Sequence, residues 1–208
     1  SETSILAQVL GFDEKSSWSV AGIDVLRGKW KELDVVIVKS GVGKVHAAMG
    51  TQTMIDRFHP DVVINIGTAA SLNEQLSVGD VVIPTSATQW DLDLSAIYAH
   101  TDNTTAVSVQ DDIASAGIIA TGDTFVADKA MKHQIYEKTG AIALDMESAA
   151  VAEVCEKNAI PCLIIKGISD GATASSPGDL QTNLNLAMSK ACSTLETVLS
   201  GFSTSVGK

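Results

Sequence analysis

Two carboxylates stand two residues apart in the segment ALDMESAAVAEV, which covers residues 143–154. The apolar residues before Asp145 are typical of a strand, and small or branched apolar residues recur at helical spacing after Ser148. Asp145 and Glu147 therefore lie at a predicted strand-to-helix turn, where open α/β sheets bind their ligands. A purely structural interpretation also fits, in which Asp145 caps the helix and Glu147 complements its dipole.

A third carboxylate, Asp170, follows the last apolar run of the chain, CLII, and the small residues Gly167 and Ser169. In a partly dry place, desolvation favours the acid form of a carboxyl group, which can then donate a proton near neutral pH. The same position also suits an ordinary helix N-cap, so both interpretations stay open.

Glycines follow a predicted strand in SGVGKVHAAMG, which begins at Ser40. A nucleotide phosphate loop requires G-x-x-x-x-G-K-[ST], and Val38 and Val45 occupy the positions of the first glycine and of the hydroxyl residue. The segment is therefore not a phosphate loop. Backbone amides at the start of the next helix can still bind an anion or a water, although a tight turn without a ligand explains the glycines equally well.

Two further segments place small or aromatic residues after strands. NIGTAASL, from Asn65 to Leu72, leaves space for a flat ligand, or for a close helix crossing. TGDTFV, from Thr121 to Val126, brings Phe125 to a position where it can stack on a planar ring while the Val126 backbone reads the edge of that ring. A phenylalanine of the core is the alternative for Phe125.

The hydrophobic pattern places these motifs on an alternating α/β succession. Apolar runs rich in β-branched residues predict strands at 35–38, 62–66, 81–83, 118–120 and 162–168. Helical spacing predicts helices at about 44–58, 147–158 and 180–199. Pro60 and Pro161 precede two of the strands and are expected to end the helices before them. The continuous apolar strands predict a sheet covered on both faces, and the polar segment 95–105 predicts a loop.

The composition bounds the class of protein. A chain of 208 residues, 45% hydrophobic and 19% charged, can bury the core of one ordinary domain, and we expect a single domain. The formal net charge of −11 argues against a nucleic-acid partner, because such binding depends on clustered Lys and Arg. We expect a small-molecule partner instead.

The sequence gives no sign of a metal, a disulfide framework or a membrane span. Four histidines lack metal-ligand spacing, and no G-x-S-x-G nucleophile elbow occurs. No apolar run approaches the roughly 20 residues that span a bilayer. We therefore expect a cytoplasmic protein without metal or cofactor, with three reduced cysteines, at Cys155, Cys162 and Cys192.

Taken in order, the motifs KSGVGKV, NIGTAAS, GDVVIP, ATGDTFV, ALDMESAA and KGISDGA resemble the purine nucleoside phosphorylase and nucleosidase superfamily. Within it, they look most like the 5′-methylthioadenosine/S-adenosylhomocysteine nucleosidases, over about residues 2–200. The resemblance implies one α/β domain, residues 1–208, with a central twisted mixed sheet flanked by helices. It also implies a homodimer that hydrolyses the N-glycosidic bond of adenine nucleosides.

The resemblance further implies a role for each matching residue. Asp170 is implied as the general acid that protonates N7 of adenine, with Ser169 as its support. Glu147 is implied to hold a ribose hydroxyl while its charge favours the oxocarbenium character of the sugar. Substrate contacts are implied for the remaining matches, with Phe125 on the adenine face, the Val126 backbone at its edge, Met146 against the ribose, Val42 near the attacking water, and Thr68, Ala69, Ala70 and Asp145 lining the pocket.

Some positions depart from the family pattern. The base that activates water follows the first strand in the family, and Glu2 is the best match, although the strand before it is missing from the sequence. Either further residues precede Ser1 or the sheet lacks its first strand. We expect the former, because a glutamate at a frayed terminus could not be held within hydrogen-bond reach of a water. Asp145 replaces a glutamate, Leu180 stands in place of an aromatic cap on the substrate, and the segment after Trp90 is short.

Two alternative functions are weighed against hydrolysis. A phosphorylase of the superfamily uses phosphate in place of water and places an arginine two residues before the glycine that matches Gly67, where this chain has Asn65. Non-catalytic binding proteins on the same scaffold lose acidic site residues, whereas Asp170 and Glu147 are both present here. The sequence therefore favours hydrolysis.

Overall fold

The fold was analysed in a computed structural model that describes residues 6, 8, 11–20, 22–94, 97, 104–107, 116–171 and 177–205. Ten strands and four helices alternate along these residues. They are β1 (Asp13–Val20), β2 (Ile23–Trp30), β3 (Leu33–Lys39), α2 (Lys44–Phe58), β4 (Val63–Ser71), β5 (Val81–Val82), β6 (Ser86–Gln89), β7 (Thr104–Ala106), β8 (Ile118–Thr121), α3 (Lys129–Thr139), β9 (Ala143–Asp145), α4 (Ser148–Lys157), β10 (Cys162–Asp170) and α5 (Pro177–Ser205).

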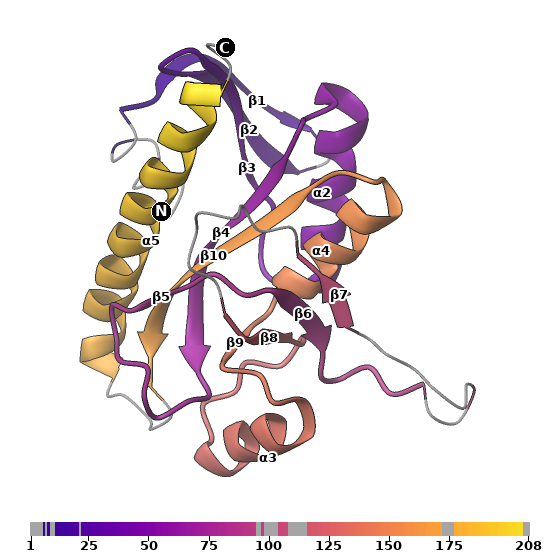
Figure 1. The fold of residues 1–208 in the computed structure, drawn as a ribbon, viewed down its shortest axis with the longest axis vertical. Coiled ribbons are helices and arrows are strands. Elements are labelled where there is room, and N and C mark those ends of the chain that lie inside the picture. The colour runs from indigo at the N-terminus through magenta and orange to yellow at the C-terminus, as the bar shows by residue number, and fades with distance from the viewer. Residues whose placement is uncertain are drawn as a thin grey trace.

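A seven-stranded mixed sheet in the order β5-β10-β4-β9-β8-β6-β7 forms the centre of the molecule (Figure 1). β10 and β4 run parallel, and so do β9, β8 and β6, but β4 and β9 are antiparallel. β4 and β9 pair over two residues only, at the carboxyl end of β4, where Ala70 pairs with Leu144 and Ser71 with Ala143. The carboxyl ends of two oppositely directed groups of strands therefore overlap in the middle of the sheet. β1, β2 and β3 form a separate antiparallel sheet.

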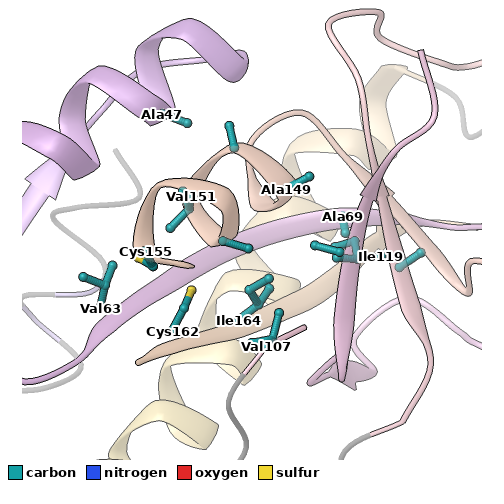
Figure 2. Close-up of a cluster of buried hydrophobic side chains, with 14 of the residues drawn as sticks. Ala47, Val63, Ala69, Val107, Ile119, Ala149, Val151, Cys155, Cys162 and Ile164 are labelled. Carbon is teal, nitrogen blue, oxygen red and sulfur yellow. The ribbon is translucent and has the colours of Figure 1, made fainter. Parts of the chain in front are cut away.

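Helices cover both faces of the large sheet, as the apolar strands predicted (Figure 1). Alternate residues of β10 enter different cores: Ile164 packs with α2 and α4 (Figure 2), and Ile165 packs with α5. At Gly167 a Cβ atom would lie 2.1 Å from the Ala187 carbonyl oxygen, so α5 is packed against the β10 backbone. The fold class inferred from the sequence is confirmed. Within the described residues, no helix combines the length and the apolar character needed to cross a bilayer.

The five predicted strands and three predicted helices are all present. α2 has the predicted bounds, α4 lies within its predicted range, and α5 extends beyond both ends of its range, with Pro177 as its first residue. α2 ends at Phe58 and α4 at Lys157, each ahead of a proline, as expected.

The sequence analysis missed α3 and the strands β1, β2, β6 and β7, whereas β9 lies at the strand-like residues that end at Asp145. α3 buries only Lys132 and Ile135, so it lacks an apolar stripe. β1 is largely exposed, and an exposed strand needs no apolar alternation.

Candidate functional site

The motif residues converge where β4, β9 and β10 meet. Asp170, at the end of β10, pairs with Ala70 of β4, and Ala70 pairs on its other side with Leu144 of β9. Asp145 follows Leu144 as the last residue of β9, and Glu147 lies in the turn before α4. The antiparallel junction between β4 and β9 thus brings the segment with Asp145 and Glu147 to the same small-residue end of β4 as Asp170.

Asp145 is the most deeply buried of the three carboxylates, with 1% of its side chain exposed. It accepts hydrogen bonds from the Ser148 backbone N–H and hydroxyl and from the Glu147 N–H, which holds the start of α4. The Thr121 hydroxyl at the end of β8 also donates to it, over 2.6 Å. The capping interpretation left open for Asp145 therefore describes its contacts in this structure.

Lys166 compensates the buried charge of Asp145, and sequence reasoning missed it. Its Nζ atom lies 3.0 Å from Asp145 Oδ2, and 3% of its side chain is exposed. A lysine is almost never buried to this extent unless it is paired. The available signal was its position within the apolar strand CLIIKGIS, because a charge in such a strand requires a partner.

Glu147 links the turn before α4 to the glycine segment before α2. Its Oε1 atom accepts a hydrogen bond of 2.9 Å from the Gly43 N–H. Of the two interpretations left open for the glycine segment, anion binding by its backbone amides agrees with this bond, although the anion is a carboxylate of the same chain. Burial raises the pKa of Glu147 above its usual value; the Lys166 ammonium and the Gly43 N–H oppose this rise, and the charge of Asp145 adds to it.

Asp170 ends β10 beside an irregularity in the register between Ile168 and Asp170. The Ser169 hydroxyl donates to Asp170 Oδ1 over 3.1 Å. Lys132 of α3 donates to Oδ2 over 2.8 Å, and 17% of the aspartate side chain is exposed. The sequence-based expectation considered only desolvation, whereas the structure adds a buried ammonium. Lys132 could not be found from the sequence because α3 itself was missed.

The other residues named from the resemblance differ in their exposure to solvent. Val42 and Phe125 are exposed, Phe125 by 70%, so the ring is not a core phenylalanine in this chain. Ala69 and Val126 are buried, whereas Thr68, Ala70 and Met146 are partly exposed. Glu2 and most of the segment 95–105 lie outside the described residues, as does the side chain of Leu180.

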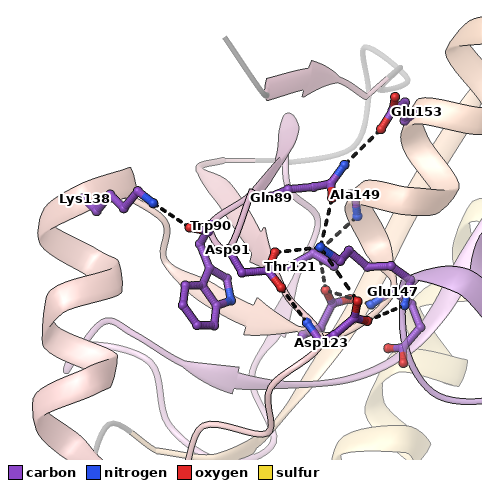
Figure 3. Close-up of polar contacts among 11 residues, drawn as sticks. Gln89, Trp90, Asp91, Thr121, Asp123, Lys138, Glu147, Ala149 and Glu153 are labelled. Atoms are coloured by element: carbon purple, nitrogen blue, oxygen red, sulfur yellow. Dashed lines mark hydrogen bonds and ion pairs between the residues drawn. The ribbon is translucent and has the colours of Figure 1, made fainter. Parts of the chain in front are cut away.

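A polar network holds the loops beside Glu147 (Figure 3). Lys44 Nζ donates to Asp91 Oδ1 at 2.7 Å and to Gln89 Oε1 at 3.1 Å. The Asp123 carboxylate accepts from the Lys44 N–H, and the Asp123 N–H donates to Asp91. Burial acts to raise the pKa of Asp91, but the bonds from Lys44 and Asp123 outweigh it and leave the pKa below its usual value. The network fixes the start of α2 against the ends of β6 and β8.

Among the described residues, the buried cations around the site are paired with carboxylates and do not form a phosphate clamp. Both buried ammonium groups near the carboxylates are engaged, Lys166 by Asp145 and Lys132 by Asp170. Asn65 donates to the Ser148 hydroxyl over 3.1 Å. In the part of the chain that the structure describes, no cluster of three or more His, Cys, Asp or Glu side chains is arranged to hold a metal ion.

The chain is similar to known proteins over most of its length. Residues 2–200 match the family model described as Phosphorylase superfamily. A 5′-methylthioadenosine/S-adenosylhomocysteine nucleosidase of Marinomonas sp. (strain MWYL1) is 32% identical, over 88% of this chain and 88% of the relative.

Two solved structures show the same fold. The 5′-methylthioadenosine/S-adenosylhomocysteine nucleosidase of Colwellia psychrerythraea 34H, in complex with adenine, has a TM-score of 0.85 and 30% identity, covering 96% of this chain and 90% of that one. The futalosine hydrolase of Helicobacter pylori strain 26695 has a TM-score of 0.87 and 26% identity, with 96% and 93% covered.

Proposed function

This chain belongs to the 5′-methylthioadenosine/S-adenosylhomocysteine nucleosidases of the phosphorylase superfamily, and we propose that it hydrolyses the N-glycosidic bond of such adenine nucleosides and releases adenine. The observation that carries this proposal is the pair of carboxylates, Asp170 and Glu147, on either side of the small-residue end of β4. The reaction needs two carboxyl groups, a protonated one for the departing base and a negatively charged one for the sugar.

Asp170 is the general acid in the proposed mechanism. It protonates N7 of the adenine, so that the base leaves as a neutral molecule instead of an anion. Its place beside Ser169 at the end of β10 supports this role. General acid assistance of this kind contributes about 10² to 10⁴ in rate.

Glu147 binds a ribose hydroxyl, and its negative charge favours the positive charge that develops on the sugar in the transition state. Glu2 is proposed as the base that activates the attacking water. Phe125 stacks on the adenine, which its exposed ring supports, and Val126 contributes its backbone, since its side chain is buried. Val42, Thr68, Ala69, Ala70, Met146 and Asp145 complete the proposed pocket.

Water, and not phosphate, is the proposed nucleophile. A phosphate dianion needs a cationic clamp. Asn65 supplies no charge, and the ammonium groups of Lys166 and Lys132 are already engaged by carboxylates.

We further propose that residues 1–208 form one nucleoside phosphorylase-like domain, that the protein is a homodimer, and that it acts in the cytoplasm without a cofactor. The three cysteines are free and buried, which fits a reducing compartment. The exposed apolar residues at the start of α2 fit a subunit contact.

The decisive experiment measures free adenine from a panel of nucleosides, with and without phosphate. The panel contains 5′-methylthioadenosine, S-adenosylhomocysteine, 5′-deoxyadenosine and futalosine. We expect phosphate-independent release, and release that requires phosphate would identify a phosphorylase instead.

In the same assay, Asp170→Asn is expected to lower kcat by about 10² to 10⁴ while adenine nucleosides still bind. Asp61→Asn, an exposed residue ahead of β4, is the matched control and should not change kcat. Near-normal turnover by Asp170→Asn would remove Asp170 from the mechanism.

A further inference from the structure

Lys132 is a buried lysine to which the mechanism above gives no role. It lies on α3, and 3% of its side chain is exposed. Its Nζ atom donates to Asp170 Oδ2 over 2.8 Å and to the Gly171 carbonyl oxygen over 2.7 Å. Both partners belong to the end of β10, so this one ammonium group connects α3 to the strand end that carries the proposed acid.

The two oxygens of Asp170 are held by different groups. Ser169 donates to Oδ1, and Lys132 donates to Oδ2. The hydroxyl of Ser169 lies 3.4 Å from the Ala69 carbonyl oxygen of the neighbouring strand. The bond to Gly171 holds the ammonium group by a contact that does not involve Asp170. The plane of the carboxyl group is therefore fixed from both sides.

We propose that Lys132 is a positioning residue for Asp170, which orients its carboxyl group and compensates the negative charge that forms there during the reaction. This inference rests on the proposed function. As the O–H bond of Asp170 breaks, an N7–H bond forms on the adenine. The electron pair of the glycosidic bond goes to the base, the oxygen of a water molecule bonds to the sugar carbon, and this water gives up one proton to the proposed base, Glu2. The carboxylate left behind is stabilised by the neighbouring ammonium group.

The Lys132 ammonium group stabilises the transition state more than the ground state, because the negative charge on Asp170 develops only as the proton leaves. An interaction of that kind raises kcat and leaves the binding of the substrate little changed. A lysine that only braced α3 against β10 would instead affect every reaction at this site equally.

The test compares two leaving groups on the same sugar. Adenine needs a proton in order to leave, whereas 4-nitrophenolate, from the 4-nitrophenyl glycoside of 5-methylthioribose, leaves as a stabilised anion. Lys132→Met, Lys132→Arg and Asp170→Asn are assayed on both substrates. Lys129→Met, at an exposed lysine of the same helix, is the control and should match the wild type on both.

We expect Lys132→Met to lower kcat on 5′-methylthioadenosine by about 10²-fold, with KM changed far less, because a misplaced catalytic group costs about that much. Lys132→Arg is expected to recover most of this loss. On the nitrophenyl glycoside, Lys132→Met and Asp170→Asn should both keep near-wild-type rates. The ratio of the two rates does not depend on how much of each variant is folded.

Two results would overturn the inference: unchanged turnover of 5′-methylthioadenosine by Lys132→Met, or equal losses on both substrates. Failure of the proposed function gives a different pattern, since then Asp170→Asn would release adenine as fast as the wild type.

Discussion

Glu147 is the carboxylate on which burial has the clearest electrostatic effect. Burial raises its pKa above the usual value of a glutamate, against the opposing effects of Lys166 and the Gly43 N–H. At this partly buried position, the protonated form of Glu147 costs less desolvation free energy than the charged form. We interpret this as a cost in stability that serves the sugar-binding role proposed for Glu147.

This cost predicts a pH-dependent gain in stability for Glu147→Gln. A pKa that is higher in the folded than in the unfolded state favours folding at low pH, and that contribution is lost as the pH rises through the folded value. Glutamine is uncharged at every pH, and its carbonyl oxygen can still accept from Gly43. Near pH 4 the wild type and the variant should therefore have similar Tm values, whereas near pH 8 the variant should melt at the higher temperature.

Thermal unfolding at a series of pH values measures this difference. Glu156→Gln, at an exposed residue of α4, the helix that follows Glu147, should show no such divergence. A constant Tm difference between Glu147→Gln and the wild type across the range would contradict the effect assigned to burial. The variant is also expected to be nearly inactive.

The sequence was sufficient to find the three carboxylates but not the two lysines that pair with two of them. Asp145, Glu147 and Asp170 follow predicted strands, which is a local pattern. The partners of Lys132 and Lys166 lie 38 and 21 residues away in the chain, so only the assembled fold shows the pairs. A single lysine is not part of any sequence motif with a characteristic spacing, so the sequence does not identify its partner.

At the scale of elements, the site depends on the junction at which β4 and β9 overlap. Lys166 in β10 and Asp145 in β9 lie on opposite sides of β4, and their ion pair spans it. Asp145 in turn binds Thr121 of β8 and Ser148 of α4. One carboxylate therefore connects three strands and a helix at the place where the strand direction reverses.

Lys166→Met is expected to lower the free energy of unfolding by about 3–5 kcal/mol, because it leaves the buried charge of Asp145 without its cation. Urea denaturation measures the loss. Lys157→Met, at the exposed end of α4, is the control and should stay within about 0.5 kcal/mol of the wild type. If Lys166→Met were as stable as this control, the pair would not hold the junction.

The reversal itself was not predictable from the sequence. Hydrophobic periodicity located five strands, but apolar runs look alike in parallel and antiparallel pairing, and nothing local specifies the neighbour of a strand. α3 and β1 were missed because they bury few apolar side chains, so hydrophobic periodicity does not mark them. The resemblance to a known family supplied the fold class that periodicity could not.

For the whole molecule, the structure leaves an apolar stripe uncovered at the start of α2. Val45 and Met49 lie four residues apart on α2, and Val42 lies two residues before the helix; all three are exposed, Val45 by 75%. The same helix contributes Ala47 to the core, so its two sides are both apolar (Figure 2). An apolar stripe of this kind is typical of a surface that contacts another subunit.

The proposed homodimer therefore makes a prediction about a single position. In sedimentation experiments the wild type is expected to be a dimer, and Val45→Glu should dissociate it, because two buried like charges would face each other or an apolar surface. Tyr136→Glu, which places the same charge at an exposed aromatic residue of α3, should leave the dimer intact. Dissociation by both variants would point to a general loss of structure, and a dimer that tolerates Val45→Glu would place the subunit contact elsewhere.

Because Val42 belongs both to this stripe and to the proposed pocket, dissociation by Val45→Glu should also weaken adenine release.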